Sequence, residues 1–259
     1  MNPALAISPS KQSGPKNLKP NWKSEFTARP ELILFVCVLV ILNGPALFGS
    51  SWISMTFEKK SVLQGEWWRL FTHPFIHVSW YHLLLDATAF LTLYAGLLEK
   101  NLFRRLSYAV AGAAGSLILA CTSLTKPDQT LCGLSGIAHG LMAVSALEMI
   151  LDASGDATIR RVGWLSLILV LGKAMFEAFT GKMFFHFLEF GLLGQPVAIS
   201  HLGGIVGSVT VWFLFQTFPG GTESCGHFGR GVKPGLKIRE FTGNSMVPCE
   251  RGTIGSEHS

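Results

Sequence analysis

Several stretches of this 259-residue chain carry no charged residue over lengths comparable to the thickness of a lipid bilayer. A helix needs about 20 apolar residues to span the hydrocarbon core. Only 14% of the residues are Asp, Glu, Lys or Arg, whereas a soluble domain has about a quarter. The longest charge-free windows are 32–57, 106–124, 129–147 and 190–219. Because backbone groups cannot stay unpaired in lipid, these windows predict membrane-spanning helices.

The full pattern predicts an all-α, polytopic membrane protein with six transmembrane helices. The expected helices cover 31–48, 82–99, 105–124, 134–151, 162–179 and 198–217. They form a membrane domain at 31–218, flanked by a polar tail at 1–30 and a flexible tail at 219–259. The fifth helix contains Lys173 and Glu177, four residues apart and therefore on one face. We expect these two residues to form an ion pair with each other, and a role at a substrate gate is the alternative.

Lys and Arg residues set the expected orientation. They gather in both tails and in the connections after the second and fourth helices. Since cytoplasmic loops are enriched in these residues, both termini are expected in the cytoplasm of a bacterium, with the protein in the inner membrane. The net charge of +5 then indicates topology and contact with anionic lipid. It does not indicate nucleic-acid binding, because basic and aromatic residues do not alternate as such a site needs.

A serine and a histidine from separate helices are predicted at similar membrane depth. Ser135, within CGLSGIAHG, falls in the first turn of the fourth helix, and His201 falls in the first turn of the sixth. Both helices begin on the outer side, which places the two residues toward the periplasm. A serine activated by a neighbouring histidine is a common nucleophile. Each residue alone would more simply be explained by packing or by a bond to its own helix.

Small residues surround both positions. Gly133 and Gly136 leave the backbone beside the serine uncrowded, and the free N–H groups at a helix start suit a developing oxyanion. Gly204 and Ser208 have the spacing of small residues that lets membrane helices approach closely. Plain helix packing explains that spacing. Close packing of the fourth and sixth helices would also bring the histidine within hydrogen-bond reach of the serine.

The start of the second helix is also polar. His82 and Asp86, in YHLLLDA, are four residues apart and share one face. Ionisable residues inside a membrane are costly and tend to mark function. The preceding segment, GEWWRLFTHPFIH, is rich in Trp, Phe and His, and its tryptophans suit a membrane interface.

Together these motifs resemble the rhomboid family of intramembrane serine proteases. Residues 133–136 resemble the GxSG motif, Trp68–Arg69 the Trp-Arg pair of the first loop, and His201 the base on the sixth helix. His82 and Asp86 resemble the HxxxN motif. The resemblance covers about residues 60–210. It implies a six-helix rhomboid-like bundle and catalysis by Ser135 and His201, with no metal or cofactor. No third acid is obvious in the sequence, so a dyad is expected.

The resemblance also implies supporting roles for nearby residues. The Ser135 backbone N–H and the His82 side chain are the expected oxyanion donors, next to Gly133. Asp86 stands where the family pattern has Asn; it either donates to the oxyanion when protonated or orients His82, and we favour the second role. His139, one turn from the serine, either competes with the sixth-helix histidine as base or supports the site. The family match favours His201 as the base.

The chain looks most similar to the rhombosortase branch, because of its compact core and the histidine in GLSGIAHG. That branch implies as substrate a membrane protein with a transmembrane segment or a Gly-Gly carboxy-terminal sorting tail. Two other functions stay open. One is a non-catalytic rhomboid-like protein that binds transmembrane segments, which only Asp86 suggests. The other is a haem or metal protein using His73, His77 and His82. The five cysteines include no CxxC and favour neither disulfides nor a four-ligand zinc site.

Overall fold

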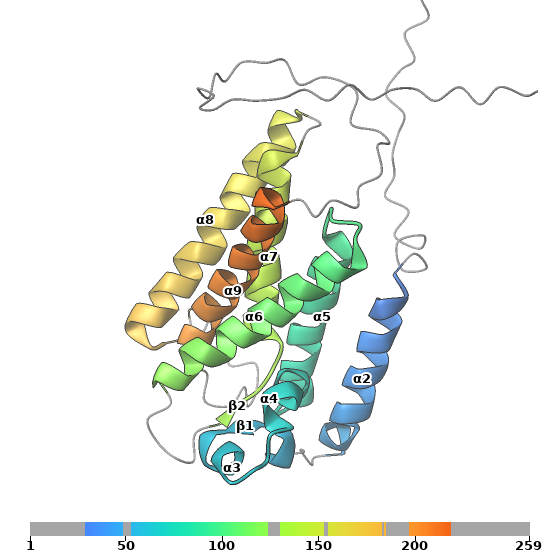
Figure 1. The fold of residues 1–259 in the computed structure, drawn as a ribbon, viewed down its shortest axis with the longest axis vertical. Coiled ribbons are helices and arrows are strands. Elements are labelled where there is room, and N and C mark those ends of the chain that lie inside the picture. Colours follow the sequence, from blue (N-terminus) through green and yellow to red (C-terminus); the bar gives the residue numbers. More distant parts are fainter. Residues whose placement is uncertain are drawn as a thin grey trace, which may run out of the picture. The chain divides into compact units, whose positions relative to one another are not determined.

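The computed structural model describes residues 29–48, 53–123, 130–152, 155–182, 184 and 197–218. Within them, six long helices lie where the charge-free windows predicted them (Figure 1). They are α2 (Pro30–Leu47), α5 (Trp80–Gly96), α6 (Leu102–Ser123), α7 (Ser135–Leu151), α8 (Ala157–Thr180) and α9 (Ile199–Thr217). Of these, α6, α8 and α9 are long and apolar enough to cross a membrane. That α2, α5 and α7 also cross stays a prediction, and the predicted tails fall almost wholly outside the described residues.

Local capping fixes the start of α5 and both ends of α8, two of the helices that carry candidate residues. Ser79 precedes α5 in an extended conformation, and its hydroxyl accepts a hydrogen bond from the His82 N–H at 3.2 Å. Asp156 caps the start of α8 in the same way, through the Thr158 N–H. Helix α8 ends at Gly181, which has a positive φ of 66°.

Helix α9 packs against α6 on one side and α7 on the other, and α8 contacts both α7 and α9 (Figure 1). Gly203 faces α6, because a Cβ there would overlap the Gly115 carbonyl. Gly204 faces α7, because a Cβ there would overlap the Gly136 carbonyl. The close approach that the small residues of the sixth helix predicted is therefore confirmed.

Replacing Gly204 by alanine is expected to destabilise the protein by about 1–3 kcal/mol, because the added methyl group has no space at the α7 backbone. The matched control is Gly172→Ala in α8, where a Cβ would meet nothing within 4 Å. Thermal unfolding of both variants in the same detergent measures the difference. Equal stability of the two would show that α7 and α9 do not touch at this point.

The outer face of α8 is apolar and exposed, as expected of a helix that faces lipid. Between about half and two thirds of the surface of each of four large side chains is accessible: Trp164, Leu165, Ile168 and Leu169. The opposite face carries the buried residues Val170, Ala174 and Glu177. Helix α8 therefore presents a charged residue to the protein interior and apolar residues outward.

The segment between α2 and α5 forms short elements that the sequence patterns did not predict. They are η1 (Ile53–Met55), β1 (Phe57–Glu58), α3 (Lys59–Leu63), α4 (Arg69–Thr72) and η2 (His73–Phe75). Strand β1 pairs antiparallel with β2 (Thr130–Leu131), with Phe57 opposite Leu131. The all-α expectation is wrong in this detail, because strands of two residues leave no periodic pattern to read. The pairing anchors the chain four residues before Ser135.

Candidate active site

Ser135 and His201 meet at the starts of two packed helices. Ser135 is the first residue of α7, and His201 lies in the first turn of α9. The Ser135 Oγ lies 3.0 Å from the His201 Nε2. The serine is half-buried, and the histidine is 4% exposed. The contact that the matched depth and the small residues predicted is thus present.

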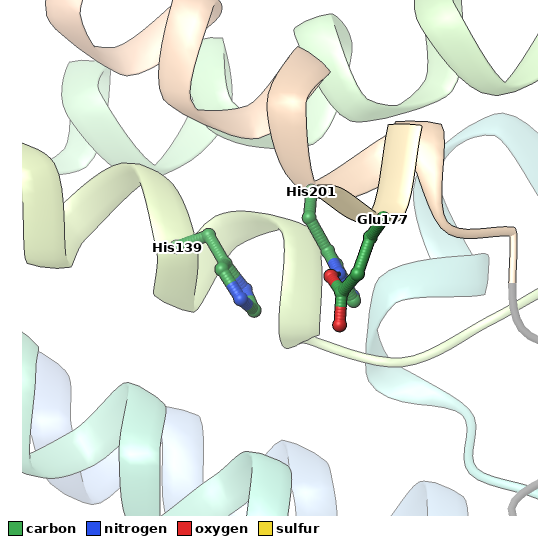
Figure 2. Close-up of side chains that lie close together, drawn as sticks. All are labelled: His139, Glu177 and His201. Atoms are coloured by element: carbon green, nitrogen blue, oxygen red, sulfur yellow. Dashed lines mark hydrogen bonds and ion pairs between the residues drawn. The ribbon is translucent and has the colours of Figure 1, made fainter. Parts of the chain in front are cut away.

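A third helix adds a carboxylate to this pair, and Figure 2 shows its side chain converging with the two histidines. The Glu177 Oε2 lies 2.7 Å from the His201 Nδ1, and the glutamate is completely buried. Its other oxygen accepts a hydrogen bond from the Phe184 N–H at 3.0 Å. Both oxygens also contact the Lys173 Nζ, at 2.8 and 2.9 Å.

These contacts correct two sequence-based expectations. A dyad without a third acid was expected, whereas an acid lies against His201. The Lys173–Glu177 pair forms as expected, but it is not self-contained, because it extends to two histidines. A signal was present: the glutamate lies near the outer end of the fifth predicted helix, at the depth of the first turn of the sixth.

His139 lies one turn after Ser135 on α7 and contacts other residues of the site. Its Nδ1 lies 2.6 Å from the Ser135 carbonyl oxygen, and its Nε2 lies 2.9 Å from the Lys173 Nζ. Its ring stacks on that of His201, with centroids 4.1 Å apart and planes 10° apart (Figure 2). Because both of its nitrogens meet other groups, the geometry favours His201 as the hydrogen-bond partner of the serine hydroxyl.

Among the described residues, the two histidines and the glutamate of the site are also the group that could hold a metal ion. His139, Glu177 and His201 each offer one ligand atom, all within 4.8 Å of one another. The ammonium group of Lys173 already contacts the His139 Nε2 and both carboxylate oxygens. A metal would therefore have to displace the lysine, and the charge of the site is balanced without one.

His82 and Asp86 lie against the turn that precedes Ser135. Gly133 has a φ of +97°, and a Cβ there would lie 2.7 Å from the Asp86 Oδ2 and 2.9 Å from the His82 Nε2. Only glycine suits this position, because it needs both the positive φ and the space. The Gly133 N–H donates to the His73 carbonyl at 3.1 Å, which holds the turn in place.

Asp86 lies between two histidine rings. Its Oδ2 is 3.3 Å from the His82 Nε2 and 3.4 Å from the His77 Nε2. The Nδ1 of His82 is buried and makes no hydrogen bond to any residue within the described ranges. The carboxylate of Asp86 therefore faces both rings. That it orients His82 stays a prediction.

We expect Asp86→Asn to lower turnover modestly, by less than about 100-fold, the smallest cost usual for losing an oxyanion donor. The amide keeps part of the contact with His82 but loses its negative charge. Turnover numbers across a pH series measure the effect, with His82→Ala as the reference. A rate well above that of the wild type would instead mean that the charge of Asp86 opposes the transition state.

The two other histidines of this region lie outside the long helices. His73 belongs to η2, and its Nδ1 lies 3.1 Å from the Arg69 carbonyl. Burial lowers the pKa of His73 to about 4, so its ring is neutral. His77 follows η2, and its Nδ1 lies 3.2 Å from the Asn43 Oδ1. These positions do not suit haem ligation, which needs histidines on facing helices.

Comparisons with known proteins indicate the family of the chain. Residues 64–217 match the model of the Rhomboid domain family. The chain is 27% identical over 165 residues to "RHOMBOID-like protein 5" of Arabidopsis thaliana, covering 62% of this chain and 48% of that protein. It is 37% identical over 95 residues to "Putative rhomboid protease YdcA" of Bacillus subtilis (strain 168), covering 35% and 46%. The chain thus spans about half the length of these curated relatives. No solved structure matches it.

The helices and the site define a helical membrane protein in which a serine and a histidine meet at the starts of two packed helices. The family match covers more than half of the chain. The chain belongs to the rhomboid family and is an integral membrane protein. Neither relative is named a rhombosortase, so that branch stays a prediction from the sequence.

Proposed function

We propose that the protein is an intramembrane serine endopeptidase in which Ser135 is the nucleophile and His201 the general base. The observation that carries the proposal is the 3.0 Å contact between the Ser135 Oγ and the His201 Nε2 at the start of α7. A serine hydroxyl is a weak nucleophile until a base takes its proton. Membership of the rhomboid family supports the same reaction class.

The proton path follows from the hydrogen bonds of the site. Because the His201 Nδ1 faces a carboxylate, the proton of the neutral ring belongs on Nδ1, and Nε2 accepts from the serine hydroxyl. Attack of the Ser135 oxygen on the scissile carbonyl forms a tetrahedral adduct as the hydroxyl proton passes to Nε2. The imidazolium then gives that proton to the amine nitrogen as the C–N bond breaks, which leaves an acyl-serine. Water attacks this ester, gives a proton to Nε2, and releases the acid as the proton returns to the Ser135 oxygen.

The developing oxyanion needs donors on the other side of the serine. Ser135 is the first residue of α7, where backbone N–H groups have no partner within the helix. The Ser135 N–H and the side chain of His82, held by Asp86 beside Gly133, are the proposed donors. The position of His82 supports this role, because its Nε2 lies against the turn before Ser135, 2.9 Å from where a Cβ at Gly133 would be.

The substrate is proposed from the sequence resemblance alone. It is a membrane protein whose transmembrane segment, or Gly-Gly sorting tail, reaches the outer end of the helices. The distribution of Lys and Arg supports cytoplasmic termini and a site open to the periplasm of a bacterial inner membrane.

The test uses the full chain in lipid vesicles. A fluorophosphonate, which modifies activated serines, is expected to label the protein at Ser135, as located by mass spectrometry. In parallel, one reporter carries a transmembrane segment and a second carries a Gly-Gly tail; the one that is cut identifies the substrate class. If Ser135 is not labelled and both reporters stay intact while binding the protein, the non-catalytic alternative replaces the proposal.

A further inference from the structure

Five polar side chains and one carbonyl at the site form a closed ring of contacts across three helices. It runs from the Ser135 hydroxyl to His201, then to Glu177, Lys173 and His139, and back to the Ser135 carbonyl. Every link is between 2.6 and 3.0 Å long. Helix α8 supplies the two charged members, α7 supplies the serine and one histidine, and α9 supplies the other histidine.

The bond directions around this ring are mutually consistent. Lys173 can only donate, so the His139 Nε2 accepts and its Nδ1–H donates to the Ser135 carbonyl. Glu177 can only accept when ionised, so the His201 Nδ1–H donates to it and the Nε2 accepts from the serine. In this pattern one positive side chain, Lys173, lies against one negative side chain, Glu177, and each of them contacts a different histidine.

We propose that Glu177 is a positioning residue for His201, so that the site works as a Ser135–His201–Glu177 triad. This inference rests on the proposed protease function. The carboxylate holds His201 in the tautomer that can take the serine proton, and it stabilises the imidazolium that forms during attack. Lys173 acts differently, because its ammonium group ties the carboxylate to His139 and not to the histidine that contacts the nucleophile.

The burial of the pair supports a role beyond an ion pair. A lysine and a glutamate four residues apart can form an ion pair on a helix surface where both reach water. The side chain of Lys173 is 23% exposed, whereas that of Glu177 is at 0%. Burying a carboxylate is expensive unless several groups compensate for it. Here the compensating groups include the same histidine that contacts the nucleophile, which an ion pair alone would not require.

The test compares two variants that break the same ion pair. Glu177→Gln removes the charge beside His201, and its amide can donate to Nδ1 and so favour the wrong tautomer. We expect kcat to fall by about 10²–10⁴-fold with little change in KM. Lys173→Met removes the pair but leaves the carboxylate on His201, and we expect a loss of less than about tenfold. Glu177→Asp, which keeps the charge, is expected to recover part of the lost kcat.

Two further measurements separate positioning from folding. The rate of fluorophosphonate labelling of Ser135 should fall with kcat in Glu177→Gln, since it reports the reactivity of the serine without a peptide substrate. Thermal unfolding in detergent identifies any variant that does not fold; if Lys173→Met does not fold, Lys173→Gln, which also removes the charge, replaces it. Equal losses of kcat in Glu177→Gln and the folded lysine variant, or full labelling of Glu177→Gln, would overturn the inference. If Ser135→Ala cleaves the reporter as the wild type does, the proposed function itself fails.

Discussion

Ser135→Ala is expected to abolish cleavage of a reporter substrate, with kcat falling by at least about 10⁴-fold. Alanine removes the Oγ that lies 3.0 Å from the His201 Nε2. The change is small and occurs at a half-buried helix start, so the variant should still fold and insert. Initial rates in vesicles measure the loss, and thermal unfolding checks the fold.

The matched control is Ser116→Ala on α6. Ser116 is buried and packs against Gly136, because a Cβ at that glycine would overlap its side chain. It belongs to no part of the proposed catalytic machinery, and its loss should leave most of the activity. Normal cleavage by the Ser135 variant would show that the nucleophile is another residue.

His201→Ala is the second change with a large expected effect, a loss of about 10²–10⁴-fold, the usual contribution of a general base. Its Nε2 meets the serine hydroxyl and its Nδ1 meets Glu177, so no other described group can take its place without moving. The measurement is again the initial rate on the reporter. Labelling of Ser135 by fluorophosphonate should slow in parallel.

His139→Ala serves as the comparison, because this ring stacks on His201 at 4.1 Å yet binds Lys173 and the Ser135 carbonyl. We expect a smaller loss, since only the support of His201 is removed. An inactive His139 variant beside an active His201 variant would reverse the choice of base.

The long helices could be predicted from the sequence because charge exclusion in a membrane protein has a physical cause. Each of the six expected ranges overlaps an observed long helix, from α2 at Pro30–Leu47 to α9 at Ile199–Thr217. The β1–β2 pairing could not be predicted in this way. It joins Phe57 to Leu131, two residues far apart in the chain, and two-residue strands have no period of their own.

The site was predictable where topology placed residues at matched depth. Ser135 begins α7 and His201 lies in the first turn of α9. These helices were expected to start on the same side of the membrane, and the glycine spacing implied that they touch. Glu177 was missed because an i, i+4 partner, Lys173, explained its presence within a single helix. The lysine and the histidine both use the same carboxylate. Spacing within a single helix does not reveal the contact between Glu177 and His201, because that contact depends on the packing of α8 against α9.

The contact between α7 and α9 also determines how the site tolerates change. At Gly136 and Gly204 two backbones touch with no side chain between them. The spacing between Ser135, beside one glycine, and His201, one turn from the other, is thus set by main-chain contact and not by the choice of rotamer in the surrounding core. Apolar residues further along, such as Leu141 and Val144, can be exchanged for others of similar volume without moving the two reacting groups apart. Sequence divergence in this interior is then compatible with an unchanged catalytic distance, provided the two glycines are kept.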